Sequence, residues 1–414
     1  MKIAMLTNNY KPFMGGVPIS VERQAQKLAD LGHEVTIFAP KYPLESGEMQ
    51  ELEYEGKVRV IRFRTGKRTL KGGICCPKVI LKEITDVFRK ETFDLIHTHH
   101  PMFVGLTALY LGRKYQIPVV YTYHTRYEEY LHYLCKKDKE NSYLGEKICK
   151  LGKEVIVPRY MKTFTNHCDL ILAPTAGMMR WIHANGTNTP IEVFPTGLEE
   201  SYYRAAPLES MKIRSQYQCK YLFCTVGRLE KEKNLEFLLS GIQKLDEKLQ
   251  DSFQMLVIGT GNQKKVLEQQ AKKLGIEQKI IFLGNIPNER VSYYLQACDL
   301  FLFTSKSETQ GIVLAEALAS SCPVVAVDAS GVEDAIENGW NGYRTVEDAD
   351  IWSDRVIDAI GSLDVMKKQA RESAKGYHAT RLAEYEEQLY RKACLSHNSS
   401  VCYTWNKVHE MKKI

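Results

Sequence analysis

The sequence lacks any apolar run close to the roughly 18 residues that a membrane-spanning helix needs, so we expect no membrane span. Its opening apolar run is too short for a signal peptide and is typical of a first strand. The 11 cysteines are scattered without a Cys-x-x-Cys pair. We therefore expect reduced thiols in a cytoplasmic protein, and neither disulfides nor zinc. A complete dinucleotide-binding fingerprint is missing as well, because residue 264 after Gly259-Thr260-Gly261 is Lys.

The length and composition predict two domains. A chain of 414 residues that is 44% hydrophobic can bury two cores, at roughly 200 residues each. Strand-like apolar stretches alternate with helical stretches, which favours an α/β architecture of two doubly wound parallel sheets. We place the domains at 1–199 and 200–375 and expect the active site in the cleft between them. The predicted strands are 2–7, 35–40, 58–64, 94–99, 118–124, 169–174 and 191–195, then 221–226, 253–258, 279–283, 299–305 and 323–328.

Two glutamates, Glu308 and Glu316, flank a predicted helix start. A strand-like apolar stretch precedes Glu308, and Gly311 opens an apolar, Ala-rich run. The unpaired N–H groups of a helix start, here near Gln310 and Ile312, bind phosphate. A ligand with hydroxyls at both ends and phosphate in the middle, such as a nucleotide sugar, fits this arrangement. The alternative is that the two carboxylates only solvate a helix.

Two cations follow another predicted strand. Arg228 comes directly after the strand 221–226, and Lys233 lies five residues further on, at the next helix start. Arginine offers a planar fork to a diphosphate, and lysine adds a point charge on a flexible stem. Because Glu230 and Glu232 alternate with the lysines, an ordinary solvated loop is the alternative. Ligands of open α/β sheets bind at the carboxyl ends of strands, where these cations and the glutamate pair both lie.

Together these motifs resemble the retaining glycosyltransferases of family 4, which have the GT-B fold. The resemblance covers nearly the whole chain. It rests on Gly15-Gly16, His124, Gly227-Arg228-Leu229 with Lys233, Gly259-Thr260-Gly261, and Glu308 with Glu316.

The resemblance implies a role for each position. The residue matching Glu308 holds the hydroxyls of the donor sugar, and the one matching Glu316 holds the ribose. Those matching Arg228 and Lys233 neutralise the diphosphate, and the one matching His124 lies beside the sugar. We assign Gly16, Gly259 and Gly261 to donor binding as well, with Gly16 allowing close backbone approach from the other domain. The resemblance also implies that a last helix at 376–395 crosses back onto the first domain, before a basic tail at 396–414.

The net positive charge of the chain comes from its first half. Residues 1–199 contain 28 Lys and Arg against 21 Asp and Glu, a net of +7, whereas the remainder has 28 against 29. Residues 57–82 carry nine basic side chains and no acidic one, and residues 126–162 interleave basic side chains with tyrosines. Such a surface suits docking on an anionic membrane. A core-facing stripe with solvated lysines is the alternative, and no nucleic-acid recognition module is visible. The proposed acceptor and membrane contacts are Arg62, Arg64, Lys67, Arg68, Lys71, Tyr127 and Tyr130.

Segments 97–101 and 121–133 further resemble bacterial diacylglycerol glucosyltransferases, which are peripheral membrane enzymes. We therefore predict a retaining hexosyltransferase that moves a hexose, with glucose as the first choice, from a UDP-sugar to a membrane lipid such as diacylglycerol at the inner face of the cell membrane. In this prediction Arg228, Lys233, His124 and Glu308 perform catalysis without a metal or other cofactor. The alternatives are the same transfer to a soluble acceptor, or a nucleotide-sugar epimerase or nucleotide-binding protein.

Two further patterns admit a metal. His97, His99 and His100 end a strand, yet no carboxylate nearby has ligand spacing. Asp348-Ala349-Asp350 has a form that other glycosyltransferases use for a divalent ion, but it precedes a peripheral helix. We interpret it as a helix cap.

Overall fold

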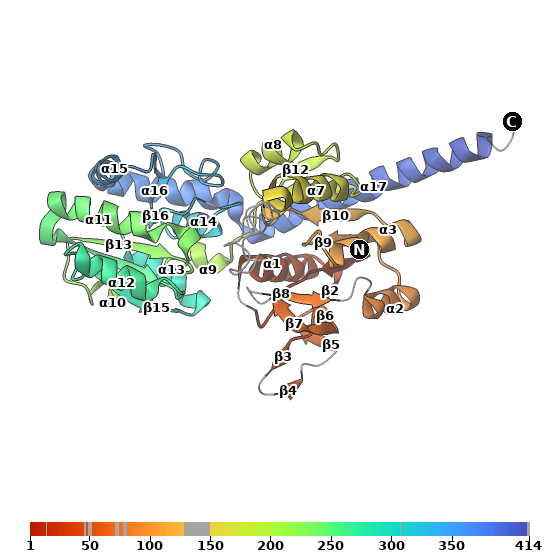
Figure 1. Ribbon diagram of the computed structural model, residues 1–414, viewed down its shortest axis with the longest axis horizontal. Coiled ribbons are helices and arrows are strands. Elements are labelled where there is room, and N and C mark those ends of the chain that lie inside the picture. Colours follow the sequence, from red (N-terminus) through yellow and green to blue (C-terminus); the bar gives the residue numbers. More distant parts are fainter. Residues whose placement is uncertain are drawn as a thin grey trace. The chain divides into compact units, whose positions relative to one another are not determined.

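The computed structural model describes residues 1–13, 15–44, 47–48, 52–70, 74–77, 81–127, 150–306 and 308–411. The chain divides into two compact units. The first contains Met1–Gly197 and Ala379–Ile414, and the second contains Leu198–His378. In each unit helices flank a central sheet (Figure 1).

The first unit is built on an eight-stranded sheet in the order β12-β11-β10-β9-β1-β2-β6-β5. Its strands are parallel except for the antiparallel pair of β5 and β6 at one edge. The strands are β1 (Lys2–Leu6), β2 (Glu34–Pro40), β5 (Leu52–Glu55), β6 (Val58–Phe63), β9 (Leu95–Thr98), β10 (Val119–Thr122), β11 (Leu170–Ala173) and β12 (Ile191–Val193). Two small hairpins pair β3 (Pro43–Leu44) with β4 (Gly47–Glu48), and β7 (Thr65–Leu70) with β8 (Ile74–Pro77).

The apolar runs of the central strands reflect burial on both faces. In β1, Ala4 and Leu6 enter one hydrophobic core, and Ile3 and Met5 enter the core on the opposite face. Helices cover both faces, as a parallel sheet requires. They are α1 (Gly16–Asp30), α2 (Lys82–Lys90), α3 (Val104–Tyr115), the π-helical turn η2 (Gly152–Ile156), α7 (Val157–Thr165), α8 (Ala176–Ala184) and α17 (Ala379–Met411).

The second unit has a six-stranded parallel sheet in the order β15-β14-β13-β16-β17-β18, with a core on each face. Its strands are β13 (Tyr221–Val226), β14 (Phe253–Ile258), β15 (Ile280–Gly284), β16 (Leu300–Phe303), β17 (Val324–Val327) and β18 (Gly342–Thr345). Its helices are α9 (Glu200–Tyr203), α10 (Pro207–Arg214), η3 (Lys231–Lys233), α11 (Leu235–Leu249), η4 (Gln250–Ser252), α12 (Lys264–Lys273), α13 (Asn288–Ala297), α14 (Ile312–Ala319), α15 (Ala349–Gly361), α16 (Leu363–Ser373) and η5 (Ala374–Tyr377).

Helix α17 returns the chain from the second unit to the first. It packs beside α1, and its buried residues Leu389, Tyr390 and Ala393 belong to the core that contains Ile3 (Figure 1). Polar side chains also secure it, since His397 contacts Asp169 at 2.7 Å. Burial of one apolar stripe on a long helix supplies most of the stability of such docking.

The predicted α/β fold with two doubly wound parallel sheets is confirmed. Each predicted strand is present with ends that differ by at most two residues, and 221–226 and 253–258 match at both ends. The prediction missed β18, the antiparallel edge strand β5 and the strands of the two small hairpins, all of which are short. Asp348 accepts hydrogen bonds from the backbone of Asp350 and Ile351, so it caps α15 as we interpreted. Within the described residues, no helix combines the length and the apolar character needed to cross a membrane.

Candidate active site

In the second unit, two side-chain hydroxyl groups that follow β16 bind the backbone of the turn that follows β13. Thr304, just after β16, donates its hydroxyl to the carbonyl oxygen of Lys233 at 3.1 Å. The hydroxyl of Ser305 donates to the carbonyl oxygen of Glu232 at 3.4 Å. These bonds hold the turn after β13 against the end of β16, so two segments about 70 residues apart form one rigid edge.

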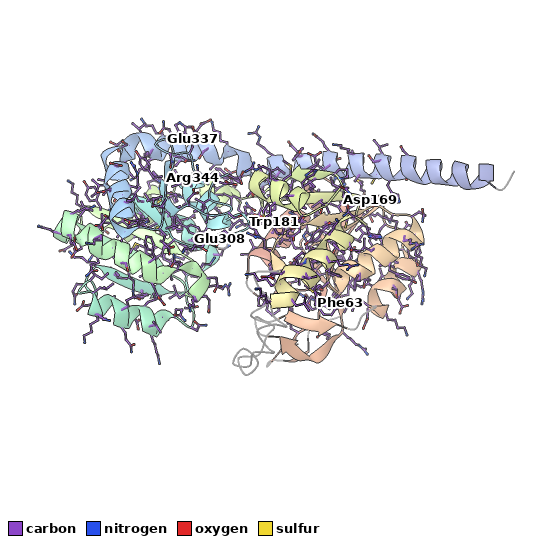
Figure 2. All side chains as sticks on the ribbon, turned by 45° about the horizontal axis from the view of Figure 1, so that its top comes forward. Phe63, Asp169, Trp181, Glu308, Glu337 and Arg344 are labelled. Atoms are coloured by element: carbon purple, nitrogen blue, oxygen red, sulfur yellow. The ribbon has the colours of Figure 1, made fainter. Side chains whose placement is uncertain are left out.

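An ion pair between Lys233 and Glu308 lies at this edge (Figure 2 labels Glu308). Glu308 also accepts a hydrogen bond from Ser305 Oγ at 2.9 Å. The two side chains are only 22% and 17% exposed, so water screens their charges less than it screens a surface pair. The sequence placed both residues at strand ends, and the structure brings them into contact.

Arg228 lies beside the same edge but points outward. Its guanidinium donates to Glu232 at 2.9 Å and remains largely exposed. A cavity at the edge is lined by both predicted cations, together with the ends of β13 and β16. Its lining residues are Thr225, Val226, Gly227, Arg228, Leu229, Lys233, Leu235, Phe303, Thr304 and Ser305.

The glycines after β14 are required by close backbone packing. Gly259 has a φ of +131°, and a Cβ at this position would lie 1.9 Å from the carbonyl oxygen of Gly227. A Cβ at Gly261 would lie 2.3 Å from the carbonyl oxygen of Leu229. Any side chain at either position would push the loop that carries Arg228 out of place.

The glutamate motif runs into α14 through a left-handed turn. Gly311 has a φ of +66° and precedes the first helical residue, Ile312. Gln310 and Glu316 are both buried, and Glu316 lies on α14 itself. The helix therefore starts where the sequence predicted, after Gly311, and Glu316 lies within it.

The first unit contains a cluster of histidines at the carboxyl ends of β9 and β10. His99 Nδ1 lies 3.0 Å from His124 Nε2, and their rings are stacked with centroids 5.3 Å apart. Burial lowers the pKa of His124 to about 3, and burial followed by the charge of His97 lowers that of His99 well below its ordinary value. Both imidazoles are therefore neutral at physiological pH. Near the start of α1, a Cβ on Gly16 would meet no atom within 4 Å.

A chain of buried hydrogen bonds extends from these histidines to α17. His97 is held by Thr122 Oγ1 at 2.7 Å through Nε2 and by the Tyr390 hydroxyl at 2.6 Å through Nδ1. The Tyr390 hydroxyl donates to Glu386 at 2.7 Å. Burial raises the pKa of Glu386 to about 8, although the hydrogen bond from Tyr390 opposes this shift. The sequence analysis missed Glu386 and Tyr390, because nothing in a helical pattern shows which polar residue faces a distant strand.

The histidines at this sheet edge bind other described partners. Both ring nitrogens of His97 are engaged by hydroxyls, and His100 Nδ1 accepts from the backbone N–H of Asn8 at 3.1 Å. Among the residues that the structure describes, no group of three or more His, Cys, Asp or Glu could hold a metal ion.

Arg62, which we predicted to contact a membrane, is buried instead. Its guanidinium donates to the carbonyl oxygens of Lys11 and Pro40 and pairs with Glu53 at 3.0 Å. The prediction for this residue is wrong. Side chains alternate along β6, and position 62 falls on the inward face with Val60.

The other predicted acceptor contacts differ in their surroundings. Arg64 is exposed. Tyr127 packs against the core of the first unit, and burial raises the pKa of its phenol, which favours the core-facing alternative for this residue. Lys71 and Tyr130 lie outside the described residues, as do the side chains of Lys67 and Arg68.

The structure reveals an exposed apolar group that the sequence analysis did not single out. Leu151, Val155 and Ile156, in and beside η2, are 52%, 50% and 57% exposed. Because a π-helix bonds residue i to i+5, Ile156 lies one turn from Leu151 on the same side. Four exposed basic residues lie near this group in the chain, Lys150, Lys153, Arg159 and Lys162, together with one exposed acidic residue, Glu154. The sequence indicated the charge but not which apolar residues the fold would leave uncovered.

Two family sequence models match the chain in succession. The model described as Glycosyltransferase Family 4 matches residues 14–202, and the model described as Glycosyl transferases group 1 matches residues 209–376. This chain belongs to glycosyltransferase family 4. It is therefore a transferase, and the order of the two matches follows the order of its two units.

Named relatives and a solved structure agree with this assignment. The alpha-monoglucosyldiacylglycerol synthase of Streptococcus pneumoniae (strain ATCC BAA-255 / R6) is 24% identical over 405 residues, 96% of this chain and 87% of the relative. The protein of the same name from Acholeplasma laidlawii is 26% identical over 406 residues, 95% of this chain and 96% of the relative. The crystal structure of Anabaena HepE in complex with UDP matches with a TM-score of 0.70 and 18% identity, over 95% of this chain and 100% of that chain. This likeness confirms the predicted GT-B fold.

The raised pKa of Glu386 predicts a pH-dependent stability. Between its ordinary pKa of 4.5 and about 8, the folded glycosyltransferase keeps the proton that the unfolded chain releases. Raising the pH in this window should therefore favour unfolding, by about 1.4 kcal/mol per pH unit. Glu386→Gln removes this contribution, so its Tm should rise relative to wild type as the pH increases from 5.5 to 7.5.

Calorimetric thermal unfolding of both proteins across this range tests the prediction. The buried histidines are common to both and cancel in the difference. Glu384→Gln, at an exposed position on the same helix, is the matched control and should follow wild type. Parallel Tm curves for Glu386→Gln and wild type would show that Glu386 is ionised in the fold.

Proposed function

We propose that this glycosyltransferase moves glucose from UDP-glucose to the hydroxyl of a membrane lipid such as diacylglycerol, with retention at the anomeric carbon. The observation that carries the proposal is the Lys233–Glu308 pair at the joined ends of β13 and β16, with Arg228 on the same cavity. Cations beside a carboxylate suit a diphosphate attached to a sugar.

The named relatives support the donor and the stereochemistry. Two full-length relatives are named as synthases of an alpha-glucosyl diacylglycerol, and the HepE structure was solved with UDP. Glucose is α-linked in UDP-glucose, so an α-glucoside product requires retention. We carry these properties to this chain as part of the proposal.

In the proposed mechanism, the protein's own groups stabilise the leaving diphosphate. Lys233 and Arg228 neutralise the charge that develops as the sugar–phosphate bond breaks, and the N–H groups at the start of α14 add oriented dipoles. A diphosphate would take Lys233 as its partner, leaving Glu308 to accept hydrogen bonds from the sugar hydroxyls. A phosphate oxygen of the leaving group takes the proton of the acceptor hydroxyl, and we propose that no divalent cation or other cofactor is needed.

Glu316 and His124 bind the donor in this proposal without exchanging a proton with it. A buried carboxylate on α14 suits a pair of ribose hydroxyls, which can donate to both of its oxygens. His124 is neutral and contributes a hydrogen bond to the hexose. Gly16, Gly259 and Gly261 allow close backbone approach, the latter two by fixing the loop that carries Arg228.

The exposed apolar group on η2 supports a membrane-bound acceptor. Burial of Leu151, Val155 and Ile156 in the interface of a bilayer would contribute roughly 1 kcal/mol each, given that about half of each side chain is exposed. Each surrounding basic residue adds about 1 kcal/mol near an anionic surface. Together these terms suit reversible, peripheral binding at the cytoplasmic face.

The first test is UDP release from UDP-glucose, with and without vesicles that contain diacylglycerol. We expect release that depends on the lipid, with an α-glucosyl lipid recovered by extraction. Release without lipid dependence would instead favour a soluble acceptor, and turnover to another nucleotide sugar without any acceptor would favour an epimerase.

Lys233→Ala should lower kcat/KM by about 10²-fold or more, because it removes a cation from the developing phosphate charge. Lys231→Ala in the same turn is the matched control, since Lys231 is exposed and is not among the residues that line the cavity. We expect this control to keep turnover close to wild type. Steady-state kinetics with UDP-glucose measures kcat/KM for both variants. Equal values in the two variants would show that Lys233 does not act in catalysis.

Replacing Leu151, Val155 and Ile156 together by Ser should weaken binding to anionic vesicles by about 100-fold, because roughly 3 kcal/mol of apolar burial is lost. Leu208→Ser with Met211→Ser is the control, because these residues on α10 are at least as exposed but belong to the second unit. Co-sedimentation at low and high salt measures the affinity. Undiminished binding of the triple variant would place the membrane contact elsewhere.

A further inference from the structure

A column of buried polar side chains crosses the first unit from α17 to His124. It passes from Glu386 through the Tyr390 hydroxyl to His97, whose ring lies 4.1 Å from that of His99. His99 then reaches His124 through the contact of 3.0 Å between Nδ1 and Nε2. The donor role assigned to His124 uses only the last ring of this column, so the other four members call for an explanation.

His99 is the member whose hydrogen bonding is incomplete. Its side chain is fully buried, and its Nε2 has no hydrogen-bond partner among the described residues. Its ring cannot turn to find one without losing the contact with His124 and its packing on His97. Since both nitrogens of His97 are held by hydroxyls, that ring is a fixed surface for His99.

Only one tautomer of the His99–His124 pair avoids a buried N–H without an acceptor. Both rings are neutral, so one of the two facing nitrogens carries a proton and the other accepts it. If His124 Nε2 were the donor, the proton of His99 would lie on its own Nε2, which has no acceptor. If His99 Nδ1 is the donor instead, His99 Nε2 carries only a lone pair, and no buried N–H group is left without an acceptor. Buried N–H groups without acceptors are rare, so the second arrangement is favoured.

We infer that His99 is a positioning residue that fixes His124 as the neutral tautomer with its proton on Nδ1. His124 is then a hydrogen-bond donor at Nδ1, whereas its Nε2 lone pair is occupied by His99. Toward a ligand it suits an oxygen acceptor, either a sugar hydroxyl or a phosphate oxygen, and it is unsuited to act as a general base. This reading of the ligand rests on the proposed function, but the tautomer itself does not.

The tautomer is measured directly on the full-length protein with ¹⁵N-labelled histidine. Two-bond ¹H–¹⁵N correlations distinguish a protonated ring nitrogen from a bare one, and the loss of signals in His124→Gln assigns them. We expect a protonated Nδ1 and a bare Nε2 on His124 at neutral pH. Protonation at Nε2 overturns the inference. Because no donor or acceptor substrate is present, this result is independent of whether the proposed function holds.

Variants of His99 test whether the tautomer matters for turnover. The amide nitrogen of His99→Asn lies where Nδ1 lies and can donate to His124, whereas the carboxylate of His99→Asp can only accept. We expect His99→Asn to keep kcat within about threefold of wild type and His99→Asp to lower it by roughly 10- to 100-fold, since small misorientations of a binding group have effects of this size.

The spectra of the same variants separate positioning from a purely structural role. His99→Asn should leave the His124 tautomer unchanged, and His99→Asp should move the proton of His124 to Nε2. The two side chains are nearly equal in size, so a role limited to filling space would leave the tautomer of His124 the same in both. An unchanged tautomer in His99→Asp, or equal kcat values in the two variants, overturns the inference.

Discussion

The parallel pairing of β13 with β16 is the constraint on which the candidate donor site depends. Parallel strands end at the same edge of a sheet, so Lys233 after one strand and Glu308 after the other meet although 75 residues separate them. The hydroxyls of Thr304 and Ser305 then fix this meeting by binding the backbone of the neighbouring turn. Gly259 and Gly261, which follow β14, let the end of this third strand pack closely against the loop that carries Arg228. Three strand ends therefore position a few charged groups on rigid backbone, which is the pre-organisation that phosphate chemistry requires.

The first unit organises its polar groups in a different way. Here the chain buries titratable side chains and leaves them neutral, because removal from water disfavours the charged form of His97, His99 and Glu386 alike. Hydroxyls of Thr122 and Tyr390 satisfy His97 without adding charge. Since Tyr390 and Glu386 lie on α17, the last helix contributes polar contacts as well as apolar packing to the sheet of the first unit. The docking of α17 and the orientation of the histidines therefore depend on the same hydrogen bonds.

The sequence predicted most of what repeats with a fixed period or follows a strand. Apolar runs located the parallel strands, and the polar segments that follow them indicated Lys233, Glu308 and His124 as candidates. Prediction from the sequence failed where the burial of a residue depends on a partner far along the chain. Arg62 looked like surface charge, yet strand alternation and the acceptors at Lys11, Pro40 and Glu53 made burial possible. Similarly, the exposure of Ile156 depends on which helix faces the fold leaves uncovered, and no local pattern encodes that.

This contrast explains why donor chemistry is easier to recognise than the acceptor. A diphosphate needs fixed cations and N–H groups, and these occur at strand ends and helix starts that leave a signature in the sequence. A lipid acceptor needs only a surface that is apolar, basic and exposed, and the same residues elsewhere would form ordinary core and ordinary solvated charge. Leu151, Val155 and Ile156 differ from core residues in their exposure alone. Under the proposed function, the surface that meets the acceptor therefore depends on exposure that arises only once the chain has folded.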